Sequence, residues 1–106
     1  GRDGDALHLV ALEEGELVGT CRLLLEELPR VRLGRLVVAA AHRRRGIASA
    51  LLAEAGQVAR AEGATTIVLH AQTYACPLYA AAGYRSRGEP FMEAGIEHVA
   101  MERELA

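Results

Sequence analysis

Three consecutive arginines, Arg43, Arg44 and Arg45, follow His42 and stand directly before Gly46 in a chain that has no lysine. Guanidinium groups donate forked, charge-assisted hydrogen bonds to phosphate oxygens. The formal net charge of the chain is -2. The cluster therefore indicates a small anionic ligand, and not the affinity for nucleic acid or membrane surfaces that a strong basic excess produces. A solvated basic turn is the alternative.

The arginines lead into a predicted helix that begins at Ile47 and ends before Gly63, because apolar residues recur on one face with helical period. The first N–H groups of a helix have no internal partner and carry partial positive charge. The bare backbone of Gly46 and the small side chain of Ala48 would let a phosphate or pyrophosphate approach closely. The segment is neither a Walker loop nor a dinucleotide fingerprint, and a glycine that merely permits a tight turn is the alternative.

The two cysteines, Cys21 and Cys76, have neither metal-ligand nor CxxC spacing. Cys76 stands near a predicted helix start, where a thiolate is favoured, but no Cys-His-Asp arrangement accompanies it. We therefore expect neither cysteine to be catalytic, and we expect no metal site.

Length and composition point to one soluble domain over residues 1–106, since 51% of the residues are hydrophobic and 25% are charged. The stretch Gly1–Asp5 is predicted to be a loop. No apolar run is long enough to cross a bilayer, and no leader opens the chain. With no disulfide framework, the expected setting is the reducing cytoplasm.

The periodicities along the chain predict the order β-β-β-α-β-α-β-β, an α/β (α+β) fold with helices flanking a mixed sheet. Glu13–Glu16 is a turn that joins the first two strands into a hairpin. The first strand is expected to be buried on both faces and the last to be half-exposed. The predicted strands cover 7–12, 17–25, 31–38, 65–70, a strand opening at 84–87, and 98–105; the helices cover 47–62 and 75–82.

The basic loop and the helix start resemble the acetyl-CoA-binding motif of the GNAT superfamily of N-acetyltransferases. That motif is roughly [Gln/Arg]-x-x-Gly-x-[Gly/Ala] after a strand that ends in valine, and Arg43, Gly46 and Ala48 fit its fixed positions behind Val38. Downstream, Leu78–Tyr84 is similar to the family's signature of a tyrosine, three residues, glycine and an aromatic. Two motifs in the right order are more specific than either alone.

A narrower resemblance is to the ElaA-like branch of the family. Ala71-Gln72 stands just before the second helix, Gly34-Arg35 precedes the apolar run, and Glu93–Met101 resembles the ending E-x-G-I-x-H-x-x-M of that branch. The likeness spans nearly the whole chain and implies a mostly antiparallel sheet. Family members usually begin with one strand and two helices before the hairpin, and the resemblance does not extend to these elements here. The expectation is a fragment, a chain whose first part is disordered and left out, or a naturally short form. Absence of the strand and the two helices would expose apolar sheet surface and favour a homodimer.

The resemblance implies how acetyl-CoA is bound. Backbone groups at the end of the central strand pair with the pantetheine arm, where the flanking strands splay apart, and amides of the loop and helix start take the pyrophosphate. Gln72 would bond the cofactor or the substrate, or else cap the following helix. The implied cofactor-binding residues are Leu36, Val37, Val38, Arg43, Arg44, Arg45, Gly46, Ile47, Ala48, Ser49 and Gln72.

Tyr79 is the implied catalytic acid, which protonates the departing CoA thiolate; a helix aromatic packed on the sheet is the alternative. The base that accepts the proton of the amine is left open. No carboxylate lies within residues 36–38, where some relatives keep a glutamate. A water chain or one of His8, His70 and His98 remains. Arg22 and Arg35 are left for an anionic substrate or for salt bridges.

The implied function is transfer of an acetyl group from acetyl-CoA to an amine of a small molecule or peptide, by direct attack of the amine. The first alternative is a non-catalytic acyl-CoA-binding module. The second is an unrelated phosphate-binding α/β domain.

Overall fold

A computed structural model describes residues 6–105, so the loop expected at Gly1–Asp5 lies outside the described residues. The described chain confirms the expected order of strands and helices and adds two short 3-10 helices, η2 and η3. The elements are β1 (Ala6–Glu13), β2 (Glu16–Glu27), β3 (Arg30–Val38), η2 (Ala40–His42), α1 (Ile47–Ala61), β4 (Thr66–Gln72), η3 (Thr73–Ala75), α2 (Cys76–Ala81), β5 (Arg85–Glu93) and β6 (Ile96–Glu104).

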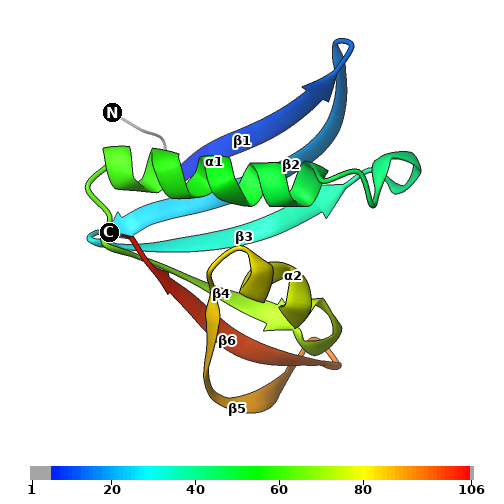
Figure 1. Ribbon diagram of the computed structural model, residues 1–106. Helices are drawn as coiled ribbons and strands as arrows, with labels where there is room; N and C mark the ends of the chain where they lie inside the picture. Colours follow the sequence, from blue (N-terminus) through cyan, green and yellow to red (C-terminus); the bar gives the residue numbers. More distant parts are fainter. Residues whose placement is uncertain (1–5, 106) are drawn as a thin grey trace.

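The strands form one six-stranded sheet in the order β1-β2-β3-β4-β6-β5. Four of the five neighbouring pairs are antiparallel, and β3 with β4 is the parallel pair. The parallel connection runs through α1, as such crossovers require. The sheet is therefore mixed and mostly antiparallel, as the sequence predicts. In Figure 1 the β1–β3 half and the β4–β6 half diverge from the point where β3 and β4 meet.

Both helices cover the same face of the sheet (Figure 1). Arg103 on β6 shows this, because its side chain lies against Gly56 of α1 and also against Gly83 just after α2. The core lies between this face and the helices, and it is built from alternate strand residues and the inner side of α1. Its largest fully buried side chains are Leu23, Leu52, Ile67, Leu69, Val31 and Cys21.

Helix α1 follows from its sequence, which is rich in alanine, the best helix former. Small residues such as Ala55 and Ala59 are fully buried and let the helix lie close to the sheet. At its C-terminus Gly63 takes φ 97°. The Ala64 N–H donates to the Ala59 carbonyl and the Gly63 N–H to the Arg60 carbonyl, both at 3.0 Å. This is a Schellman cap, which the glycine permits.

One expectation for the strands is wrong. Strand β1 is not buried on both faces: Leu9 is buried, whereas Val10 and Leu12 are 55% and 63% exposed. The reason is that β1 is an edge strand and the helices cover only one face. The strand expected to open at 84–87 is β5, which begins at Arg85 and continues to Glu93 after a register shift between Arg87 and Phe91. Pro90 is tolerated there because β5 is the other edge strand.

No helix within residues 6–105 has the length and apolar character that a membrane span requires.

Candidate active site

The site is a cleft that opens where β3 and β4 separate. The two strands pair only between residues 30–32 and 66–68. Beyond that point β3 continues to Val38 and β4 to Gln72 without pairing to each other. Each strand keeps its other neighbour, β2 and β6 respectively. The edge of β3 that faces β4 therefore presents unpaired backbone N–H and C=O groups over 33–38, and such groups can bond an extended ligand as a further strand would.

A β-bulge shapes the same edge. Thr20 on β2 pairs with Val37, but Arg22 pairs with Gly34, so that β3 has one residue more than β2 in this interval. Arg35 lies within the bulge and has φ 55°. Bulges bend a strand and increase its local twist, which fits the divergence of β3 from β4.

The start of α1 lies beside the end of β3, and two glycines make this possible. A Cβ atom at Gly19 on β2 would lie 3.1 Å from side-chain atoms of both Ile47 and Leu51. Gly46 is the N-cap residue of α1 with φ 81°, and no side chain caps the helix. The first helical bond runs from the Ala50 N–H to the Gly46 carbonyl. The amides of residues 47–49 therefore have no helical acceptor and are free for an anion.

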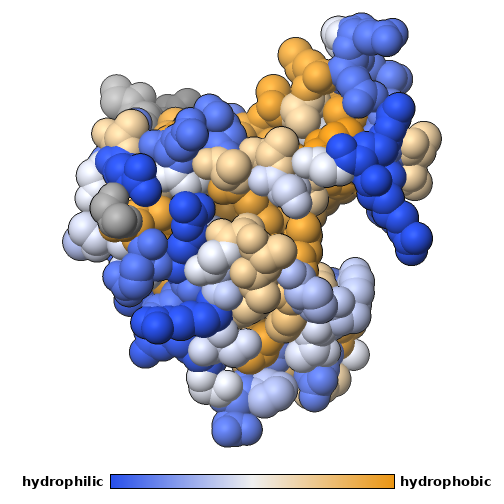
Figure 2. Space-filling view, viewed as in Figure 1, coloured by the Kyte–Doolittle hydropathy of each residue, from blue (hydrophilic) through white to orange (hydrophobic). Residues whose placement is uncertain are grey.

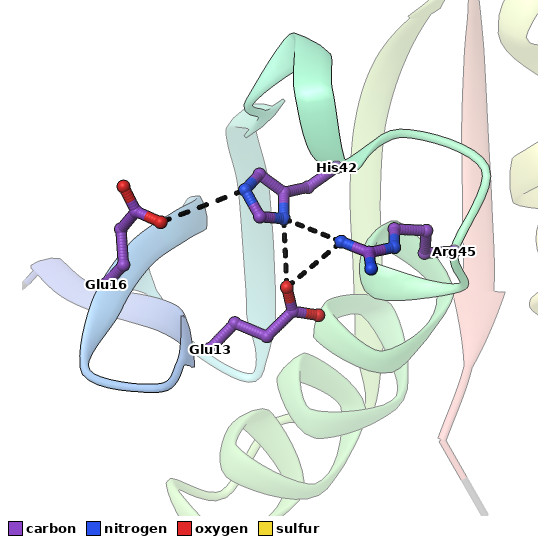
Figure 3. A network of polar contacts seen from close by, with 4 residues as sticks. All are labelled: Glu13, Glu16, His42 and Arg45. Atoms are coloured by element: carbon purple, nitrogen blue, oxygen red, sulfur yellow. Dashed lines mark hydrogen bonds and ion pairs between the residues drawn. The ribbon is translucent and has the colours of Figure 1, made fainter.

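Part of the basic loop is bound to the β1–β2 hairpin and not to the cleft (Figure 3). Nδ1 of His42 lies 2.9 Å and the Arg45 guanidinium 3.1 Å from Oε1 of Glu13. Nδ1 of His42 also lies 2.9 Å from Arg45. A single Nδ1 cannot donate to Glu13 and accept from Arg45 at once, so the consistent arrangement has both donors converging on the carboxylate. Nε2 of His42 lies 3.9 Å from Glu16.

The other arginines of the loop are placed differently. Arg43 lines the cleft, and its Nε donates to the Val38 carbonyl at 3.1 Å. Arg44 is exposed and has φ 64°. Of the three arginines, only Arg43 has a side chain that lines the cleft.

The cleft has a volume of about 580 Å³. Figure 2 shows it as a hollow between the basic loop and the β4–β6 half, with apolar residues along its inner wall. Of the residues that the sequence assigns to acetyl-CoA or to catalysis, those that line the cleft are Leu36, Val37, Val38, Arg43, Ala48, Gln72 and Tyr79. Arg44, Arg45, Gly46, Ile47 and Ser49 do not line it, although Gly46, Ile47 and Ser49 form the adjoining helix start.

Tyr79 projects from α2 on the helix-covered face. It is partly buried against the core, and its ring meets that of Tyr84 edge-on at 6.0 Å between centroids. Burial raises the pKa of the Tyr79 phenol, with smaller contributions from Tyr74, Cys21 and Cys76. The hydroxyl is therefore protonated at neutral pH and able to donate a proton.

Two of the histidines considered as bases line the cleft, and one does not. His98 and His70 are among the lining residues, whereas His8 is not. His98 is buried, with 9% exposed, and its Nδ1 lies 2.8 Å from the Ile96 carbonyl. His70 lies 3.2 Å from Arg32 through Nε2 and 3.2 Å from Glu93 through Nδ1. Gln72 precedes η3 without a capping side-chain hydrogen bond, so its amide is not used as a cap.

Neither cysteine lies in a setting that favours a reactive thiolate together with a partner base. Cys21 is in the core, and burial raises the pKa of its thiol, which disfavours the nucleophilic thiolate. Cys76 is partly buried at the first turn of α2. Within residues 6–105 no cluster of three or more His, Cys, Asp or Glu side chains could hold a metal ion.

Sequence reasoning missed part of the cleft wall. Tyr74 and Ala75 line the cleft and were not singled out, and Leu78, which also lines it, was named only as the start of the tyrosine motif. Tyr74 is 80% exposed. These residues lie in η3 and α2, directly after β4. A signal was available, because ligands bind beyond the carboxyl ends of strands where a sheet opens.

Comparison with known proteins agrees with this architecture. A UPF0039 protein of Schizosaccharomyces pombe is 38% identical over 93 residues, which cover 86% of this chain and 62% of that protein. The crystal structure of Escherichia coli ElaA superposes with a TM-score of 0.85 at 27% identity, covering 96% of this chain and 70% of that one. An aminoglycoside 6'-N-acetyltransferase complexed with coenzyme A superposes at 0.84, with 17% identity and coverage of 96% and 74%.

The last of these likenesses shows the fold alone, given its low identity. The chain spans less than two thirds of the S. pombe relative. The model of the family described as "Acetyltransferase (GNAT) domain" matches residues 2–105. A match of this extent, on a sheet that opens between β3 and β4 beside a helix start, leaves one conclusion: the chain belongs to the GNAT acetyltransferase family.

Proposed function

We propose that this protein transfers an acetyl group from acetyl-CoA to an amine of a small molecule or peptide, without a covalent enzyme intermediate. One observation carries the proposal: the unpaired edge of β3, the uncapped start of α1 and the phenol of Tyr79 all border the single cleft between β3 and β4. The coenzyme A in the aminoglycoside 6'-N-acetyltransferase structure supports the choice of cofactor.

Each part of the cofactor has a matching part of the cleft. The pantetheine arm carries amide groups, and the backbone groups at 36–38 that have no partner could bond them as a strand would. The Val38 carbonyl already accepts a hydrogen bond from Arg43. The diphosphate is an anion, and the amides of residues 47–49 together with the Arg43 guanidinium are suitable donors. The thioester would then lie deeper in the cleft, toward Tyr79.

The proposed reaction needs a proton donor for the leaving sulfur. In solution a phenol titrates near ~10 and a thiol near ~8.5, so donation from tyrosine to a thiolate is moderately uphill. Burial raises the pKa of Tyr79 further. A CoA thiolate in the same cleft would be desolvated too, and this raises its proton affinity for the same reason. Because burial raises both pKa values, it does not by itself prevent proton transfer from the phenol to the thiolate.

The proposal is tested first by binding and then by turnover. CoA should raise the thermal unfolding temperature of the full-length protein, by mass action, when it is present far above its dissociation constant. Thiol release from acetyl-CoA is then measured across a panel of primary amines and short peptides. Binding without thiol release from any amine would favour a non-catalytic acyl-CoA-binding module.

Tyr79→Phe is the variant that tests the assigned acid. It removes one hydroxyl and keeps the ring against Tyr84, so the thermal shift with CoA should be unchanged. Turnover should fall by about 100-fold, the lower end of what general acid catalysis contributes. Cys76→Ser, in the same helix, should keep wild-type turnover. Full activity in Tyr79→Phe would remove Tyr79 from the mechanism.

A further inference from the structure

The reaction proposed above needs a group that accepts the proton of the attacking amine, and the cleft is short of such groups. Amines are mostly protonated at neutral pH, so a base must act before or during attack. Within the described part of the chain, no Asp or Glu side chain lines the cleft. The bases that remain in its wall are histidines. The inference that follows rests on the proposed function.

Three of the four histidines are excluded by their surroundings. His8 lies on the edge strand β1 and does not line the cleft. His42 is held by Glu13 in the hairpin network of Figure 3. His70 lines the cleft, but both its nitrogens are engaged: the Arg32 guanidinium can only donate, so Nε2 accepts and Nδ1 donates to Glu93. Its lone pair is therefore occupied.

His98 differs from the others because one ring nitrogen is free and its state is fixed. The Ile96 carbonyl, 2.8 Å from Nδ1, can only accept a hydrogen bond, so Nδ1 carries the proton of the neutral ring. The lone pair must then be on Nε2. That atom has no hydrogen-bond partner among residues 6–105. His98 is 9% exposed, and its ring lies nearly parallel to that of Phe91, with centroids 6.1 Å apart.

The register of the sheet places the His98 side chain on the face of the sheet that the helices do not cover. His98 pairs with Gln72 across β4 and β6, and His70 pairs with Ala100, so these side chains share one face. That face is the helix-free one, because the alternate residues Leu69, Ala71 and Val99 are in the core beneath the helices. Tyr79 comes from the helix-covered side. A proton acceptor and a proton donor thus border the cleft from its two sides.

A second hollow suggests how an amine could reach His98. It has a volume of about 570 Å³ and is lined by Arg32, Arg87 and Ala100 among others. Leu69 and His70 line both this hollow and the cleft, so the two are adjacent. An acceptor that occupied the hollow would approach the thioester from the side of His98.

The charged and titratable side chains around His98 come from each neighbouring element. Glu93 of β5 accepts a hydrogen bond from Nδ1 of His70. Glu97, the preceding residue on β6, accepts a hydrogen bond from Thr73 and is exposed. The groups that share the cleft wall with His98 are Arg35 and Arg43 of the β3 side, His70 of β4, Tyr74 of η3 and Tyr79 of α2.

From this geometry we infer that His98 is the catalytic base, and that Nε2 takes the proton of the attacking amine. The amine nitrogen forms a bond to the thioester carbonyl carbon as its proton passes to Nε2. The C–S bond then breaks, its electron pair goes to sulfur, and Tyr79 donates the proton that makes free CoA thiol. His98 releases its proton to solvent and Tyr79 regains one, so the products are an acetamide and CoA.

The test compares His98→Asn with His8→Asn in the full-length protein. Asparagine can still donate to the Ile96 carbonyl but offers no base at the position of Nε2. With the best amine of the panel, kcat/KM of His98→Asn should fall by about 100-fold or more, while the thermal shift with CoA is kept. In the pH profile of kcat/KM, the fall in rate at acid pH that comes from a group of the enzyme, and not from the amine, should disappear. His8→Asn should keep both rate and profile.

A measurement on the wild-type protein covers the case in which the variant does not fold. The ring of His98 is titrated by NMR, and its midpoint must coincide with the acid limb of kcat/KM. Wild-type rate and profile in His98→Asn, or a midpoint that does not coincide, overturns the role of His98 and leaves acetyl transfer standing. A wild-type protein that binds CoA but acetylates no amine overturns both proposals.

Discussion

At the scale of single residues, the candidate site depends on two positions that have no side chain and on one side chain with an unpartnered ring nitrogen. Gly46 starts α1 without a capping side chain. Gly19 lets that helix start lie against β2. His98 lines the cleft and has one ring nitrogen bonded to its own strand, while the other has no hydrogen-bond partner among the described residues. The chemistry of these positions is local, and each can be tested by one substitution.

Gly46→Ala tests the helix start. The residue has φ 81°, and a Cβ atom there would meet nothing within 4 Å. The cost in stability is therefore backbone strain alone, roughly 1–2 kcal/mol, measured by denaturant unfolding. The methyl group would also keep the diphosphate from the first amides. The affinity for CoA should then fall by about tenfold, roughly the worth of one charge-assisted hydrogen bond.

Gly95→Ala is the matched control for this change. Gly95 has φ 76° in the β5–β6 turn, and its Cβ would also meet nothing within 4 Å. It should lose similar stability and bind CoA as the wild type does. Equal CoA affinity in the two variants would place the diphosphate away from Gly46.

At the scale of elements, the loop between β3 and α1 divides its arginines between two tasks. Arg45 joins His42 on the Glu13 carboxylate and thereby ties the loop to the β1–β2 hairpin. Arg43 bonds the end of β3 and borders the cleft. Consecutive residues in an irregular loop point in different directions, so neighbours in sequence need not share a ligand.

Arg43→Gln and Arg45→Gln separate the two tasks. Loss of the Arg43 charge should raise the Kd for CoA about tenfold, because it removes a charge-assisted hydrogen bond to phosphate. The salt dependence of CoA binding should weaken at the same time, because the variant makes one charge–charge contact fewer that salt can screen. Calorimetric titration at two salt concentrations measures both effects.

For Arg45→Gln we expect a Kd within about twofold of wild type. Its ion pair with Glu13 is largely exposed, and such pairs contribute about 0–1 kcal/mol, so the variant should unfold nearly as the wild type does. A larger loss of CoA affinity in Arg45→Gln than in Arg43→Gln would reverse the assignment.

At the scale of the whole molecule, a core on one face holds together two halves of a sheet that diverge. Strands β3 and β4 share few paired residues, and the Arg103 side chain of β6, which lies against Gly56 of α1, is a further link between the halves. Tyr84 is part of that core and is 3% exposed, but its hydroxyl has no hydrogen-bond partner among the described residues. Burial, more than any neighbouring charge, raises the pKa of this phenol.

Tyr84→Phe should therefore leave stability unchanged or increase it. The substitution removes a buried polar atom that lacks a partner, and such an atom costs roughly 1–3 kcal/mol. Chemical denaturation measures the effect, with Leu52→Ala as a reference that should lose about 2–5 kcal/mol. A Tyr84→Phe variant less stable than wild type by more than about 1 kcal/mol would mean that the hydroxyl is bonded.

The sequence by itself determined the order of elements and the position of the helix start. Periodicity, turn residues and the Arg43–Ala48 motif are local signals, and α1 begins after Gly46 as predicted. Tertiary structure decided what depends on contacts between distant residues. Whether β1 is buried on one face or two depends on which face the helices cover. The pairing of Arg45 with Glu13 joins residues far apart in the chain. The free nitrogen that distinguishes His98 from His70 exists only once the strands are in register, because cross-strand neighbours bring Arg32 and Glu93 to one histidine and leave the other open.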